Sequence, residues 1–113
     1  MATVDSKTSQ QALNMILKAI GLRESDYKGT ITIRGKDPIL ASRHRFGELM
    51  AASQAALGMA LSNLWELRGG KAQNVITDVR NAVHQHHGVA FMRQNGRSLP
   101  FTDYGAAGGV DHL

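Results

Sequence analysis

The sequence predicts a helix-rich α/β domain with few short strands. Residues 46–68 carry a long helical pattern, while residues 29–35 and 74–79 have the β-branched composition of strands. These segments alternate along the chain, which is typical of α/β folds. Because two strands alone make a marginal sheet, we expect either that a second chain completes the sheet or that the domain is mostly helical.

Length and composition indicate one folded domain over residues 1–113, with flexible ends at about residues 1–8 and 105–113. The hydrophobic content of 42% and the charged content of 19% exclude a disordered chain. No apolar run approaches a membrane span, and the N-terminus lacks a basic patch followed by an apolar segment. The absence of cysteines excludes disulfides and thiolate metal sites, so we expect a soluble cytoplasmic protein.

The first third of the chain predicts a helix followed by a strand. Helical spacing places four apolar side chains on one stripe: Leu13, Ile16, Leu17 and Ile20. Ser9 is a candidate N-cap of this helix, and Gly21 is its expected stop. In the strand at residues 29–35, Ile31 and Ile33 alternate with polar residues, which predicts one buried face.

A basic loop leads into the long helix. An Asp-Pro pair interrupts the preceding strand, and Ser42 is a candidate cap for the helix. Three basic residues follow: Arg43, His44 and Arg45. They precede the helix N-terminus, where the helix dipole disfavours cations. Glu48 or a bound anion would offset these charges, and the alternative is a solvated basic loop.

The long helix at residues 46–68 is apolar on more than one side. Helical spacing places eight residues on one face that we expect to be buried: Leu49, Ala52, Ala56, Leu57, Ala60, Leu61, Leu64 and Trp65. The other half carries small residues: Ala51, Ala55, Gly58 and Ser62. No charge lies between Glu48 and Glu66, so we expect packing on both sides, by the same chain or by a second chain. Gly69 and Gly70 supply the stop.

The C-terminal third predicts a strand at residues 74–79 and a helix that starts at Arg80 or Asn81. The one dense group of metal-ligand residue types is His84, His86 and His87. Two imidazoles one turn apart, without a nearby carboxylate in the sequence, make a weak zinc site, so we assign no metal. Nucleotide-binding glycine motifs and hydrolase motifs are absent from the sequence.

The segment from Gly47 to Val83 resembles part of the family III CoA transferases, the CaiB/BaiF group. In that family a Gly-Asp pair opens an Ala- and Gly-rich helix, which ends in an Arg. A glycine-bearing turn and a Gln then precede a hydrophobic strand and a helix start bearing Ala. The matching residues in this chain are Gly47, Glu48, Gly58, Leu64, Arg68, Gly70, Gln73, Val75 and Ala82. The lead-in DPILASRHRFGE also fits, so the resemblance covers about half of the chain.

The resemblance implies an acyl-CoA site. Family members use the Asp of the Gly-Asp pair as a nucleophile or as an acid or base, and they form interlocked dimers. Glu48 occupies that position here, and the resemblance makes Gly47, Arg43 and Arg45 candidates for binding coenzyme A. The arginines would hold its phosphates. Family members are several times longer, so most of the units that build their CoA site are absent from this sequence.

Three functional hypotheses follow. The first is a non-catalytic α/β domain, similar to part of a family III CoA transferase and completed by oligomerisation. It acts by association with a second copy or with a larger transferase-like chain, and it requires no cofactor. The second is a CoA-transferring or racemase-like enzyme in which Glu48 acts on acyl-CoA. The third is a basic accessory module for nucleic acid, suggested by the net charge of +4, although the basic residues are scattered and only 5% of residues are aromatic.

Overall fold

The computed structural model describes residues 2–86, 88 and 92–98, and the chain divides into two compact units, residues 1–83 and 84–113. The prediction of one folded domain over residues 1–113 stays a prediction. The predicted flexible end at residues 105–113 lies outside the described residues. The first unit holds the core and the candidate site.

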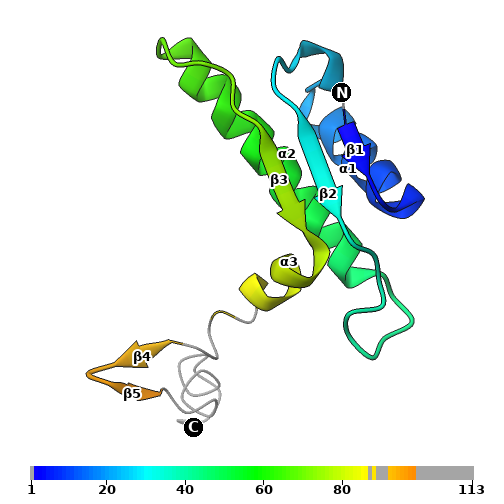
Figure 1. Cartoon of the computed structure of the whole chain (residues 1–113), viewed down its shortest axis with the longest axis vertical. Coiled ribbons are helices and arrows are strands. Elements are labelled where there is room, and N and C mark those ends of the chain that lie inside the picture. The colour runs from blue at the N-terminus through cyan, green and yellow to red at the C-terminus, as the bar shows by residue number, and fades with distance from the viewer. Residues whose placement is uncertain (1, 87, 89–91, 99–113) are drawn as a thin grey trace, which may run out of the picture. The chain divides into compact units, whose positions relative to one another are not determined.

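The first unit is a three-stranded parallel sheet covered by two helices (Figure 1). Its elements are β1 (Ala2–Val4), α1 (Lys7–Ile20), the 3-10 turn η1 (Glu24–Asp26), β2 (Ile31–Arg34), α2 (Phe46–Leu67) and β3 (Val75–Asp78), and α3 (Val79–His86) begins in it. The strand order is β1-β2-β3, with Ala2 opposite Ile31 and Ile31 opposite Val75. Right-handed crossovers that step in one direction place α1 and α2 on the same face of the sheet. The predicted helix-rich α/β class is confirmed.

The start of the chain differs from the prediction. Residues 1–8 were expected to lack regular structure, but Ala2–Val4 form β1 and pair with β2. The Asp5 carboxylate also accepts the backbone N–H of Gly35, at 2.8 Å. A three-residue strand is too short for its alternation to be recognised in the sequence. The third strand of the sheet therefore comes from this chain itself.

Helix α1 also begins earlier than predicted. It starts at Lys7 with Ser6 at the N-cap position, so Ser9 is not the cap but lies buried in the first turn. Leu13 and Leu17 are buried as predicted, whereas Ile20 is 54% exposed. Gly21 ends the helix with a φ of 75°, a left-handed conformation that suits glycine, and this prediction is confirmed.

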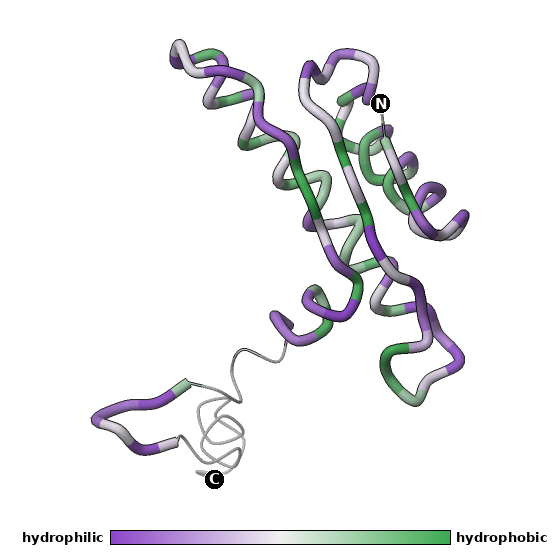
Figure 2. Tube along the Cα trace, in the orientation of Figure 1, coloured by the Kyte–Doolittle hydropathy of each residue, from purple (hydrophilic) through white to green (hydrophobic). Residues whose placement is uncertain are grey.

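The core lies between the sheet and the two helices. Ile31 and Ile33 of β2 are buried, and Thr32 and Arg34 alternate with them on the other face, as predicted. The other core residues on these elements are Leu13, Leu17, Ala51, Ala52, Ala55, Ala56 and Met59. Figure 2 shows the hydrophobic positions of β2 and β3 next to those of α2. Small side chains on α2 therefore meet larger ones on the sheet and α1.

The connection from α2 to β3 is held by side-chain hydrogen bonds and one ion pair. Gly69 has a φ of 93°, which confirms the predicted glycine stop. The backbone N–H of Gln73 donates to Ser62 Oγ at 2.9 Å, and the Gln73 carbonyl accepts a hydrogen bond from the Tyr27 hydroxyl. Lys28 and Glu66 form an ion pair at 3.4 Å. These contacts set where β3 enters the sheet.

The second unit contains a short hairpin that was not predicted from the sequence. Strands β4 (Arg93–Gln94) and β5 (Arg97–Ser98) pair antiparallel around Asn95 and Gly96. These two residues have φ values of 52° and 76°, the conformation that a two-residue hairpin turn requires. The Asn-Gly dipeptide was the sequence signal for this turn.

Candidate functional site

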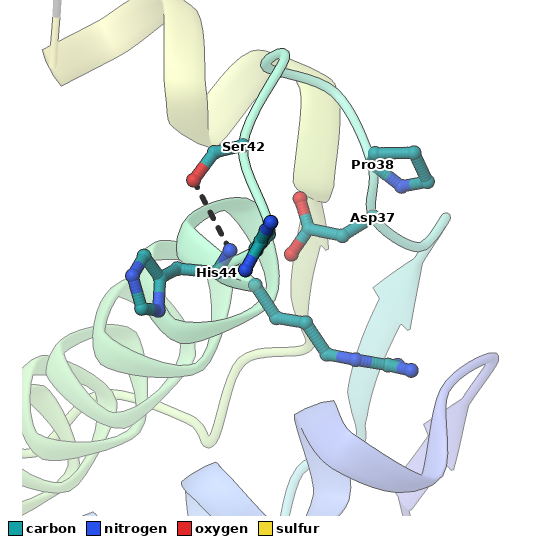
Figure 3. Close-up of a pocket in the computed structure, with 6 residues that line it drawn as sticks. Asp37, Pro38, Ser42 and His44 are labelled. Atoms are coloured by element: carbon teal, nitrogen blue, oxygen red, sulfur yellow. Dashed lines mark hydrogen bonds between the residues drawn. The ribbon is translucent and has the colours of Figure 1, made fainter.

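A small pocket lies in the loop after β2, at the carboxyl edge of the parallel sheet. Its volume is about 200 Å³, and it is lined by Asp37, Pro38, Ser42, Arg43, His44 and Arg45 (Figure 3). Parallel α/β proteins commonly bind ligands outside this edge of the sheet. The predicted basic approach to the long helix therefore coincides with a pocket.

Asp37 occupies the N-terminus of α2. Its Oδ1 accepts the backbone N–H of Gly47 at 3.2 Å, and its Oδ2 accepts the backbone N–H of Glu48 at 2.8 Å. A carboxylate here satisfies two free amides and is stabilised by the positive end of the helix dipole. An incoming anion would find both amides already paired.

The predicted cap of α2 is wrong. Ser42 Oγ accepts the backbone N–H of His44 at 3.1 Å, a local turn contact that Figure 3 shows, and Arg45 is the N-cap residue without a side-chain cap. A cap predicted from the sequence is sought among the residues directly before the first helical turn. Asp37 lies ten residues before Gly47 and reaches the helix only because the loop folds back. Nothing in the sequence around Asp37 therefore indicates that it contacts α2.

Glu48 is fully buried beneath the loop. Its Oε2 lies 3.4 Å from Arg45 Nη1, and the same guanidinium donates to Thr8 Oγ1 at 3.1 Å. Its Oε1 has no hydrogen-bond partner among the described residues. The prediction that Glu48 helps to offset the basic residues agrees with this ion pair. Neither Gly47 nor Glu48 lines the pocket, and the catalytic role of Glu48 stays a prediction.

The two arginines of the pocket differ in their contacts. Arg45 is held by Glu48 and Thr8, whereas Arg43 makes no hydrogen bond or ion pair with the described residues. The His44 ring lies 5.5 Å from the Phe46 ring. Of the residues predicted to bind coenzyme A, Arg43 alone keeps a cation available in the pocket.

The outer side of α2 is apolar and exposed. Six of its large residues are between 42% and 59% exposed: Phe46, Leu49, Leu57, Leu61, Leu64 and Trp65. Leu67, at the end of the helix, is 85% exposed. We call this surface the outer face of α2. The sequence predicted that Leu49, Leu57, Leu61, Leu64 and Trp65 would be buried, and the structure corrects this. Only Ala52 and Ala56 of the predicted face are fully inside.

The inner side of α2 carries mostly small residues. Ala51, Ala55 and Ser62 are buried against the sheet and α1, together with the larger Met59. A Cβ added at Gly58 would lie 2.8 Å from Val75 Cγ1, so the helix approaches β3 too closely for larger side chains. Packing distance, rather than hydrophobicity, therefore decides which side of α2 is buried.

Three of the glycines that match the family pattern occupy crowded positions. A Cβ at Gly47 would lie 2.6 Å from Asp37 Oδ1 and 2.7 Å from Val79 Cγ1. Gly58 touches Val75, and a Cβ at Gly70 would overlap the Trp65 indole. Close packing accounts for these three glycines without any catalytic role.

The histidine group does not add a metal site within the described residues. Among them, no three His, Cys, Asp or Glu side chains are grouped as metal ligands would be. His84 and His86 belong to α3, and His87 lies outside the described residues. In the same part of the chain, no helix has both the length and the apolar character to cross a bilayer.

No family model, curated protein or solved structure matches this chain.

Proposed function

We propose that this chain is a non-catalytic association domain that resembles part of a family III CoA transferase. Its outer face of α2 binds an apolar surface of another protein molecule, either a second copy or a larger transferase-like chain. The observation that carries the proposal is the exposed row of phenylalanine, leucine and tryptophan side chains on α2. Contiguous exposed apolar surface of this kind marks interaction sites in folded proteins.

The absence of charge on this surface supports the proposal. From Leu49 to Trp65 the helix carries no charged residue, although much of this stretch faces outward. A solvated helix face normally carries charged side chains. Each half-exposed leucine loses on the order of 1 kcal/mol of favourable transfer free energy while it faces water. Covering the face recovers that free energy.

The state of Glu48 also favours association over catalysis. A carboxylate nucleophile must reach its substrate, but Glu48 is fully buried, is paired with Arg45 and lies outside the pocket lining. Asp37 occupies the amides at the helix N-terminus, which are the donors that would otherwise stabilise an anion. The two helix amides and the Arg45 guanidinium are thus already paired with the chain's own carboxylates.

The test is the molar mass by light scattering across a range of protein concentrations. Wild type should rise above the monomer mass in the micromolar range. The double variant Leu57→Glu with Leu64→Glu should remain monomeric, because association would bury two carboxylates. Gln11→Glu with Ala19→Glu, on the exposed side of α1, adds the same charge and should behave like wild type. A wild-type chain that stays monomeric at every concentration would exclude a second copy as the partner and leave only the larger chain.

A second candidate function is the binding of coenzyme A or an acyl-CoA, and the specific observation in its favour is Arg43. This guanidinium lines the pocket without a partner among the described residues and suits a phosphate group. Calorimetric titration with CoA and acetyl-CoA should then give binding that Arg43→Met weakens at least several-fold. An acyl-transfer assay on Glu48→Gln, corrected for the folded fraction, tests catalysis. No heat from either ligand would rule this candidate out.

A further inference from the structure

The hairpin of the second unit carries an asparagine whose side chain is unprotected. Asn95 and Gly96 form the two-residue turn between β4 and β5, and residues 92–98 are all exposed. The Asn95 side chain has no hydrogen-bond partner among the described residues. A Cβ added at Gly96 would meet no atom within 4 Å, so the space around the turn is open. Water therefore reaches both the side chain and the backbone that follows it.

A glycine directly after an asparagine permits a reaction within the chain. The backbone nitrogen of the following residue can attack the side-chain carbonyl carbon of the asparagine and close a cyclic imide. A side chain on the following residue hinders this ring closure, and glycine has none. Of the five asparagines in the sequence, Asn95 alone precedes a glycine, and the others precede Met, Leu, Val and Ala: Asn14, Asn63, Asn74 and Asn81. Ring closure is therefore least hindered at Asn95.

Secondary structure also protects the other four asparagines more than it protects Asn95. Three of them lie in α1, α2 and α3, and Asn74 Oδ1 accepts the backbone N–H of Thr30 at 3.1 Å. Ring closure in a helix requires the helix to open first. Strands β4 and β5 pair through only two residues each, and a hairpin of this size is marginally stable in water. The turn at Asn95 thus opens more readily than a helix.

Two arginines favour the reaction at this turn. The attacking nitrogen must give up its proton, and a neighbouring cation stabilises the negative charge that develops on it. Arg93 precedes Asn95 by two residues, and Arg97 directly follows Gly96. Residues 92–98 include no acidic residue. The local charge and the open turn therefore act in the same direction.

We propose that Asn95 is a site of spontaneous deamidation. The Gly96 nitrogen bonds to the side-chain carbonyl carbon of Asn95, and the bond from that carbon to the side-chain nitrogen breaks. The proton of the Gly96 N–H leaves with this nitrogen as ammonia. Water then hydrolyses the cyclic imide at one of its two carbonyl carbons. One opening gives aspartate, and the other gives isoaspartate, in which the main chain runs through the former side chain.

Either product changes the hairpin. Each replaces a neutral amide by a carboxylate close to Arg93 and Arg97, which lowers the net charge of the chain by one. Isoaspartate also adds a carbon to the main chain between Gln94 and Arg97, whose pairing depends on a two-residue turn. The register between β4 and β5 is then lost. This site belongs to the second unit, so the inference does not depend on the proposed association.

Incubation of the full chain at mildly alkaline pH and physiological temperature tests the inference. Peptide mass spectrometry follows the loss of the amide at each asparagine, and an isoaspartyl methyltransferase with labelled S-adenosylmethionine detects isoaspartate. Asn95 should react at least about tenfold faster than any other asparagine, because it needs no helix opening. Gly96→Ala is the matched variant, and its added methyl group should slow the reaction at Asn95 several-fold.

The same incubation in urea measures each reaction without the fold. Asn95 should react in the native chain within about tenfold of its rate in urea, because the short hairpin gives little protection. The helical asparagines should gain more from unfolding. A native Asn95 that reacts no faster than the other four would overturn the inference, and so would protection greater than this by the fold. An unchanged rate in Gly96→Ala would also overturn it, because attack by the residue 96 nitrogen would then not limit the reaction.

Discussion

The inner and outer faces of α2 differ in a way that reverses the usual expectation. The inner face is buried and consists largely of alanine, with Glu48, Met59 and Ser62 also inside. The outer face is about half exposed and carries the phenylalanine, leucines and tryptophan. A periodicity analysis ranks the leucine side as the core side, because it weighs hydrophobicity and ignores the distance to the neighbouring element.

Close packing explains the reversal. At Gly58, α2 lies so close to Val75 of β3 that a Cβ would not fit, although the same side of the helix also buries the larger Met59. Small residues on α2 also allow it to approach α1, which supplies the larger Leu13 and Leu17. The large residues of α2 are then left for a surface outside this domain.

Enlarging the inner face should strongly destabilise the domain. Ala55→Leu adds three carbons where the side chain has no exposed surface, and overpacking of this kind costs about 3 kcal/mol. Ser53→Leu, two residues away on the outer face, is the matched control and should change the free energy of unfolding by less than about 0.5 kcal/mol. Urea denaturation followed by circular dichroism, in dilute protein, measures both. Equal losses would mean that the two faces do not differ as described.

Removing the ion-pair partner of Glu48 should be the next largest effect. Arg45→Met leaves a fully buried carboxylate without its counter-charge. We expect a loss of about 2 kcal/mol, below the range for fully buried pairs because Arg45 is itself 59% exposed. Arg43→Met removes a neighbouring arginine that has no such partner and should leave the unfolding free energy nearly unchanged. If both variants lose the same stability, Arg45 has no special role beneath the loop.

Loss of the long-range cap should be smaller. Asp37→Ala removes the acceptor of two α2 amides and should cost about 1 kcal/mol, the usual value for a helix cap. Asp37→Asn retains an acceptor and should recover part of that loss. Ser42→Ala, which removes the cap expected from the sequence, should have little effect in the same denaturation measurement. A larger loss for Ser42→Ala than for Asp37→Ala would refute the assignment.

Truncation on the outer face should have the smallest effect on folding. Leu57→Ala removes a side chain that is 59% exposed, so the unfolding free energy of dilute protein should change by about 0.5 kcal/mol or less. Its effect should appear instead in the concentration at which the chain associates, which light scattering records. A large loss of stability in dilute protein would place Leu57 in the core of the single chain.

Much of the first unit was predictable from the sequence. The helix at residues 46–68 and the strands around Ile31 and Val75 gave clear periodic or β-branched patterns, and the structure places α2, β2 and β3 there. Strand β1 was missed because three residues carry too little pattern. The hairpin around Asn95 and Gly96 was missed although its turn signal was present.

The site was less predictable because its contacts are long-range. Arg43 and Arg45 were recognised by their charge, but their different surroundings depend on Glu48 and Thr8, and Thr8 belongs to another helix. Asp37 looked like a strand breaker, since nothing in its neighbourhood indicates that it returns to cap α2. Sequence patterns identify local structure well, but they do not report which distant groups the fold brings together.

The most direct test of the central claim, that the outer face of α2 is covered by a partner molecule, is the alkylation rate of Ser53→Cys. This substitution is nearly isosteric, and position 53 is exposed on α2 between Leu49 and Leu57. We predict that iodoacetamide reacts about tenfold more slowly at high protein concentration than at low, because association covers the thiol. Ser25→Cys, in η1 and away from α2, should react at the same rate throughout. If the Ser53→Cys rate is also independent of concentration, the outer face stays open to solvent and the claim is wrong.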